Sequence, residues 1–187
     1  MARAEHYWVA LFCFLFPADA LEGLKLVWLA IWWGAASSKL NRHFPSVVAV
    51  MISNHPIIKW KWLKKRLFKN YPDNLQASTL TKTMAHFGTI IEYCFPLLLL
   101  FGNGGTLTIV ALCIMFLFHL YITSSFPMGV PLEWNIIMVY GAFLLFGYHT
   151  TVFPFAIENG LLIIILAIAL LLPVSYTHLT LPTTPYV

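Results

Sequence analysis

The stretch that decides the fold is ASTLTKTMAHFGTIIEYCFPLLLLFGNGGTLTIVALCIMFLFHLYI, from Ala77 to Ile122. It contains two apolar runs, Ala77–Phe101 and Thr106–Ile122, joined by the four residues GNGG. A helix of about 20 mostly apolar residues crosses a hydrocarbon core about 30 Å thick. The glycine cluster lacks the lysine and the serine or threonine of a phosphate-binding loop, so it is typical of a tight turn. The stretch predicts a hairpin of two membrane-spanning helices.

The composition of the whole chain points to the same class. Of 187 residues, 60% are hydrophobic and only 10% are charged, and the mean hydropathy is +0.79. These values lie outside the usual range of a soluble domain. The run LLIIILAIALLL, Leu161 to Leu172, does not alternate as a strand of a membrane barrel does. The sequence therefore predicts an all-α fold, a polytopic transmembrane helical bundle.

Three further apolar runs bring the expected number of spans to about five. They are Leu21–Leu40, Glu133–Tyr148 and Leu161–Leu172. Tyr7–Phe16 is too short to span, and although Ala18-Asp19-Ala20 imitates a signal-peptide cleavage site, we interpret the run as a truncated or interfacial helix. Phe44–Ile52 is also short, and it predicts a re-entrant or surface-lying piece.

The end of the chain differs abruptly from the apolar run before it. Val174–Thr183 resembles the translation of a sequencing-library adaptor, so residues 174–187 are set aside as artefactual. We expect residues 1–173 to form one transmembrane helical domain, as a fragment of a longer protein.

A basic segment follows the short run, and it holds six of the eleven basic residues of the chain. Tryptophans and leucines alternate with the charges, which predicts a basic amphipathic helix on anionic lipid head groups. A nucleic-acid patch is the alternative, but a cytoplasmic connection between spans is expected to be basic. We therefore place the segment on the cytoplasmic face of a bacterial inner membrane, with a multi-pass chain and no nucleic-acid partner. Its basic residues are Lys59, Lys61, Lys64, Lys65, Arg66 and Lys69.

Polar residues recur inside the run Ala77–Phe101 at intervals of three or four. Such spacing places them on one helix face, with Glu92 at its edge. Ionisable groups in a membrane must face protein or water, so the stripe is predicted to point into the bundle. His86 and Glu92 are candidate functional residues, the alternative being hydrogen bonds that hold helices together. The stripe consists of Thr79, Lys82, His86, Thr89 and Tyr93.

The stretch FHLYITSSFPMGVPLEWN, Phe118 to Asn135, interrupts two apolar runs with polar and helix-breaking residues. Pro127 and Gly129 are expected to prevent a regular helix, and irregular backbone at membrane depth is tolerated only where it is buried or lines a cavity. This stretch is therefore predicted to form a cavity wall. The expected cavity-lining residues are Thr89, Tyr93, His119, Ser124, Ser125, Met128 and Gly129. Cys13, Cys94 and Cys113 each stand alone, so the sequence suggests no metal site.

The segments SKLN, HFPSVVAV, HFGTIIEYCFPLLLLF and SSFPMGVPLEWN resemble a family of bacterial transmembrane proteins of unknown function, from about Pro17 to Pro154. The order of these motifs is also similar to the transmembrane part of the vitamin K-dependent gamma-carboxylase and of horizontally transferred transmembrane domains. That similarity implies that Lys39 matches a lysine that deprotonates a hydroquinone. The residues themselves indicate no cofactor, and a membrane quinone is implied by the similarity alone. The chain has one lysine where the carboxylase has two, and it lacks the large soluble portion.

Two hypotheses of function follow. The first is a membrane enzyme acting on a quinol or lipid, with Lys39 as general base and His86 and Glu92 as orienting groups. A lysine acts as a base only where burial disfavours its charged form. The second is a non-catalytic transport or assembly subunit. In that case Lys39 is an ordinary helix-terminal lysine whose ammonium extends to the membrane surface.

Overall fold

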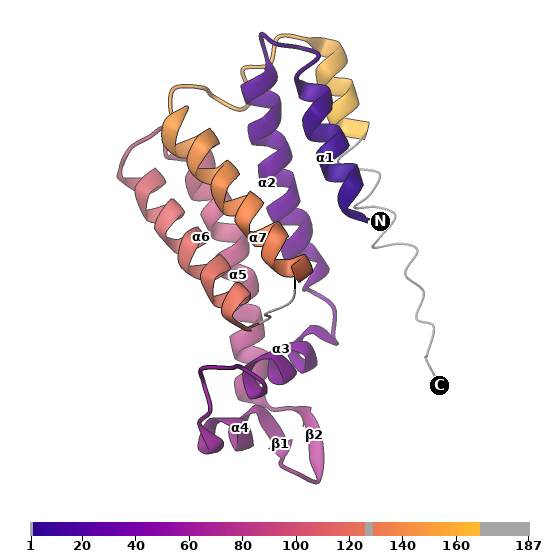
Figure 1. The fold of residues 1–187 in the computed structure, drawn as a ribbon, viewed down its shortest axis with the longest axis vertical. Coiled ribbons are helices and arrows are strands. Elements are labelled where there is room, and N and C mark those ends of the chain that lie inside the picture. The colour runs from indigo at the N-terminus through magenta and orange to yellow at the C-terminus, as the bar shows by residue number, and fades with distance from the viewer. Residues whose placement is uncertain (1, 126–128, 169–187) are drawn as a thin grey trace.

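The computed structural model describes residues 2–125 and 129–168, and there the chain is mostly helical (Figure 1). The all-α expectation is confirmed, with one small pair of strands added. The expectations for Met128, for the last residues of the run Leu161–Leu172 and for the tail from Val174 lie outside the described residues. The elements in chain order are α1 (Ala2–Cys13), α2 (Ala20–Ser38), α3 (Phe44–Ser53), α4 (Lys61–Leu67), β1 (Phe68–Asn70), β2 (Asn74–Ala77), α5 (Thr79–Phe101), α6 (Thr106–Ser125), α7 (Gly129–Ala142) and the π-helical turn η1 (Phe143–Tyr148).

The long helices form one bundle. α5 packs between α2 and α6, and α6 packs against α7 (Figure 1). α1 and a last helix at residues 160–168 lie beside the upper part of α2, whereas α3, α4 and the strands lie at the other end of the bundle. Among the described helices, α5 and α6 are long and apolar enough to cross a membrane. The hairpin predicted from Ala77–Ile122 is thus present, and two of the five expected spans have the length and composition of a span.

The core of the bundle is centred on Trp32 of α2, which is 1% exposed. Its ring meets Phe95 of α5 edge to face at a centroid distance of 5.2 Å, and it lies 6.3 Å from Phe146. α7 approaches α2 closely because residue 141 is a glycine, where a Cβ atom would lie 2.3 Å from the ring of Trp28. Small residues at such contacts let helices in membranes pack closely.

The connection after η1 is tied to α2 by two buried charged residues. The ammonium of Lys25 donates to the carbonyl oxygens of His149 (2.7 Å) and Val152 (2.5 Å). The carboxylate of Asp19 accepts from the backbone N–H groups of Glu158 and Asn159, just before residues 160–168. Polar backbone in this connection is therefore satisfied by side chains from the first turns of α2.

The basic segment differs from its prediction. It is helical only from Lys61 to Leu67, and the chain then turns into β1, which pairs antiparallel with β2. Leu67 and Phe68 are both buried against Ala49 and Ile52 of α3, which anchors the point where helix becomes strand. The turn-forming residues NYPDN, 70–74, then stop the helix and reverse the chain. The predicted helix to Lys69 was wrong because this small core was not visible in the helical pattern.

The short run Phe44–Ile52 forms a helix of its own, α3, which packs against α5 at the basic end of the bundle. The stretch expected to be irregular is shorter than predicted, because α6 extends to Ser125 and α7 begins at Gly129. Gly129 therefore starts a helix instead of breaking one. The hydroxyls of Ser124 and Ser125 both donate to the carbonyl oxygen of Tyr121, within α6.

Candidate functional site

The junction between α2 and α3 fixes the position of Lys39. Lys39 follows the last residue of α2, and its backbone N–H donates to the carbonyl of Ala36. The side chain of Asn41 closes the turn, since its Oδ1 accepts from the backbone of His43 and Phe44 and its Nδ2 donates to Ser38. This hydrogen-bonded corner directs the chain from α2 into α3 and holds Lys39 at the side of the bundle facing α5.

Lys39 forms an ion pair with Glu92 of α5, in which Nζ donates to Oε2. The Glu92 side chain is 4% exposed and that of Lys39 is 21% exposed. The ammonium also lies 5.6 Å from the centre of the Phe118 ring, a cation–π contact. A buried ion pair carries a large desolvation cost, so its presence inside an apolar bundle points to a role other than packing.

The buried face of α5 agrees only in part with the stripe that the sequence suggested, because Thr89 is buried and Tyr93 is half-buried. Thr79, Lys82 and His86 are exposed, whereas Thr81, Ala85, Thr89 and Glu92 are buried. Thr89 belongs to both sets, but Thr81, Ala85 and Glu92 each lie one residue before a predicted position, a rotation of about 100° around the helix. Glu92 therefore lies on the buried face and not at its edge, and the structure does not bring His86 to Lys39 and Glu92. The apolar residues Ala85, Phe95 and Leu99 mark this buried face.

Tyr93 and Thr89 make contacts between and within helices. The hydroxyl of Tyr93 is 2.6 Å from that of Ser37, and the indole of Trp33 donates to the Tyr93 carbonyl. Thr89 donates to the carbonyl of Ala85, one turn earlier in α5. The contacts of Tyr93 join α2 to α5 beside the ion pair. Neither Tyr93 nor Thr89 lines the cavity described next.

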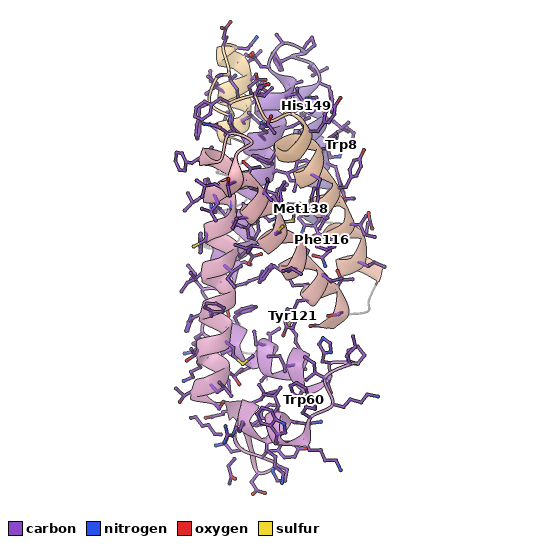
Figure 2. The ribbon with its side chains drawn as sticks, turned by 90° about the vertical axis from the view of Figure 1, so that its left-hand side faces the viewer. Trp8, Trp60, Phe116, Tyr121, Met138 and His149 are labelled. Carbon is purple, nitrogen blue, oxygen red and sulfur yellow. The ribbon has the colours of Figure 1, made fainter. Side chains whose placement is uncertain are left out.

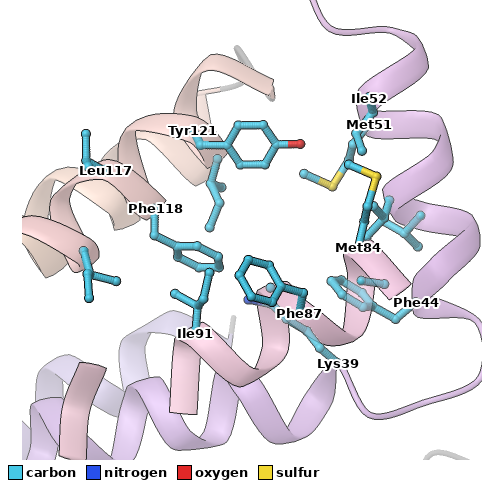
Figure 3. A pocket seen from close by; sticks show the side chains of 16 residues that line it. Lys39, Phe44, Met51, Ile52, Met84, Phe87, Ile91, Leu117, Phe118 and Tyr121 are labelled. Atoms are coloured by element: carbon cyan, nitrogen blue, oxygen red, sulfur yellow. The ribbon is translucent and has the colours of Figure 1, made fainter. Parts of the chain in front are cut away.

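A largely apolar cavity of about 630 Å³ adjoins the ion pair (Figure 3). We call it the α3 cavity, because α3 forms one wall and α5 and α6 form the others. Lys39 and Tyr121 contribute polar groups, and the rest of the lining is almost entirely aliphatic, aromatic or methionine side chains. Its most prominent apolar residues are Phe44, Met51, Met84, Phe87, Ile91 and Phe118. The sequence predicted a cavity wall in residues 118–135, and of the described residues in that range, Phe118, Tyr121 and Ile122 line the α3 cavity.

His119 belongs to a separate network. The indole of Trp32 donates to its Nε2 (3.2 Å), so the imidazole is neutral and its Nδ1 donates to Oδ1 of Asn135 (2.6 Å). His119 and Asn135 line a groove of about 450 Å³ between α6 and α7. All three side chains are buried, which links α2, α6 and α7 through one chain of hydrogen bonds.

In the described residues, 2–125 and 129–168, no three His, Cys, Asp or Glu side chains are placed to hold a metal ion. The site is therefore described by an ion pair, an apolar cavity and a neutral histidine network.

The fold and this site define a helical membrane protein with a charged pair buried beside an apolar cavity. The chain belongs to the family described as transmembrane protein of unknown function, DUF3556, which matches residues 1–181. The match includes part of the tail that sequence analysis set aside. No curated protein and no solved structure matches the chain.

Proposed function

We propose that this protein binds a lipophilic molecule of the quinol or lipid class in the α3 cavity, and that the Lys39–Glu92 pair contacts the polar group of that molecule. The observation that carries the proposal is the position of a buried ion pair at the wall of an apolar cavity. The proposed setting is the bacterial inner membrane, crossed by about five helices.

The size and chemistry of the cavity fit such a ligand. Binding sites for small molecules have volumes of about 300–1,000 Å³ and combine apolar walls with a few polar groups. The α3 cavity has a volume of about 630 Å³. Met51 and Met84 lie next to each other on the α3 side of the cavity (Figure 3), and flexible thioether side chains adapt to ligands of varied shape.

The ion pair gives the cavity its chemical specificity. The Glu92 side chain is nearly inaccessible, but the Lys39 side chain is partly exposed, and its ammonium lies over the Phe118 ring at the cavity wall. A hydroxyl, carbonyl or phenolate oxygen of a ligand in the cavity would therefore contact the Lys39 ammonium, whose other neighbour is the buried carboxylate of Glu92. Such an arrangement stabilises negative charge that develops on the ligand oxygen.

A catalytic role is the second candidate, and it also rests on Lys39 at the cavity wall. In this role Lys39 first passes its ammonium proton to Glu92, the acceptor of its hydrogen bond. The neutral amine then takes the proton of the quinol and becomes an ammonium again, and the quinol is left as its anion. Substitution of Lys39 by Arg separates the two candidates, since Arg preserves the charge and the pairing but does not act as a base. Binding retained with activity lost supports catalysis, whereas retention of both supports the binding role alone or a non-catalytic transport or assembly subunit.

Filling the cavity tests the proposal directly. Gly88 lines the α3 cavity, and a Cβ atom added there lies 3.9 Å from Phe118, an ordinary contact. Gly88→Leu therefore places a side chain into the cavity without forcing the helices apart. Thr83→Leu, on the exposed face of α5 and outside the cavity, is the matched control.

The measurement is extraction of the purified full chain, followed by mass spectrometry of the lipophilic molecules bound per protein. We expect Gly88→Leu to lower the bound amount at least fivefold and Thr83→Leu to leave it within twofold of the parent. Equal amounts in all three proteins, or no stoichiometric molecule in the parent, would overturn the proposal.

A further inference from the structure

A second cavity, at the basic end of the molecule, carries a separate inference. It has a volume of about 360 Å³ and lies between the loop after α3 and the helix α4. We call it the lysine cavity, because Lys59, Lys61 and Lys64 all line it. Ser53, Asn54 and His55 also line it, and among the residues that the structure describes no carboxylate belongs to the lining.

The positive charge of this cavity has no acidic partner among the residues that the structure describes. In the described residues, neither Lys59 nor Lys61 forms an ion pair, and Lys64 meets the ring of Tyr71 at 5.9 Å. Three positively charged side chains that border one hollow repel one another, and an anion bound among them lowers that repulsion. The cavity therefore has the chemistry of a phosphate site, in which lysines act as point charges.

The loop that forms the cavity is held in a defined shape. Nδ1 of His55 accepts the backbone N–H groups of Ile57 and Ile58, both at 3.1 Å. Nε2 of His55 is 3.2 Å from the Ser124 hydroxyl, and its ring stacks on Tyr121 at 6.1 Å. His55 itself is 5% exposed, so the loop is fastened to the end of α6 and its lysines are presented from a fixed backbone.

Apolar groups beside the lysines indicate that the anion belongs to a lipid. Trp60 and Trp62 stack on each other at a centroid distance of 5.9 Å, and both are exposed, as is Ile57. Figure 2 shows Trp60 at the end of the molecule opposite His149. Exposed tryptophans next to lysines are typical of a surface at the level of lipid head groups.

We infer that the lysine cavity binds the phosphate of an anionic phospholipid at one defined site. This goes beyond attraction of a basic segment to a charged membrane, because Lys65, Arg66 and Lys69 do not line the cavity. The inference is independent of the ligand proposed for the α3 cavity. It predicts that position, and not charge alone, decides which basic residues bind the lipid.

The distribution of lysines within α4 provides a matched pair of variants. Lys61→Gln with Lys64→Gln removes two charges from the lysine cavity, and Lys65→Gln with Arg66→Gln removes two charges from the same helix outside it. Diffuse attraction to an anionic membrane is about 1 kcal/mol per basic residue and falls equally in the two variants. Any difference between them reports the cavity.

The purified full chain in neutral detergent is titrated with phosphatidylglycerol, with phosphatidylcholine and with inorganic phosphate, and bound molecules are counted by native mass spectrometry. We expect one phosphatidylglycerol to bind at least tenfold more tightly than phosphatidylcholine. The cavity variant should weaken this binding at least tenfold more than the outside variant. If the affinity losses of the cavity variant and the outside variant agree within twofold, the inference is overturned. It is also overturned if the protein binds inorganic phosphate but not phosphatidylglycerol.

A second pair of variants leaves the lysines in place. Ser53 lines the cavity at the end of α3, and Ser46 is exposed near the start of the same helix and outside the cavity. Ser53→Asp introduces a carboxylate among the lysines and should abolish the single lipid site, whereas Ser46→Asp should change its affinity less than twofold. Unchanged lipid binding in Ser53→Asp would also overturn the inference.

Discussion

Breaking the Lys39–Glu92 pair should destabilise the bundle to an extent that depends on which partner is removed. In Lys39→Met the carboxylate of Glu92, 4% exposed, loses the ammonium that is its hydrogen-bond partner. Removal of one partner from a buried pair costs about 3–5 kcal/mol, because the other charge stays buried and uncompensated. We expect a loss near this range for Lys39→Met.

Removing the carboxylate instead should cost less. In Glu92→Gln the amide oxygen still accepts from the Lys39 ammonium. The Lys39 side chain is 21% exposed, so its charge stays in partial contact with solvent or lipid head groups. Loss of the charge in such a hydrogen bond costs about 1–2 kcal/mol. The double variant Lys39→Met with Glu92→Gln leaves no buried charge, and it should be more stable than Lys39→Met alone.

The assay is reversible unfolding of the purified protein in mixed micelles, followed by circular dichroism, for the parent, both single variants and the double variant. The double-mutant cycle yields the interaction energy between positions 39 and 92, which we expect to exceed about 2 kcal/mol. Additive effects of the two substitutions would refute the reasoning. So would a loss below 1 kcal/mol in Lys39→Met, since an uncompensated carboxylate buried in the bundle is costly.

Two further predictions concern the arrangement of the chain. If the basic end is cytoplasmic, a cysteine-free variant carrying Lys65→Cys should resist a membrane-impermeant thiol reagent in intact cells. The same background with Thr106→Cys, at the turn between α5 and α6, should be labelled. The reverse pattern would invert the topology. A Cβ atom at position 141 would lie 2.3 Å from the Trp28 ring, so Gly141→Val should lower the unfolding free energy by about 1–3 kcal/mol in the same micelle assay. Gly160→Val is the control, because a Cβ atom at position 160 meets nothing within 4 Å. Equal effects of the two substitutions would contradict the close approach of α2 and α7.

Local sequence patterns predicted the parts of the fold that depend on local chemistry. The lengths of α5 and α6 follow from their apolar runs, and the turn between them follows from its glycines. Asn103 (φ 43°) and Gly104 (φ 74°) adopt the left-handed backbone that such a turn requires. Lys39 and Glu92 were both selected as candidate residues, Glu92 because a carboxylate in an apolar run is costly unless it has a partner, and Lys39 from resemblance to a lysine motif.

What the sequence by itself determined is the membrane class, the helical elements and the unusual polar residues within them. Only the tertiary structure decided that Lys39 meets Glu92 across 53 positions of sequence, that His119 lies between Trp32 and Asn135, and that the chain beyond Leu67 becomes a strand. The physical reason is that helical periodicity fixes the angles of side chains only about the axis of their own helix. Which of two neighbouring stripes on α5 becomes buried depends on contacts with α2, α3 and α6, and those contacts form between residues that are distant in the chain.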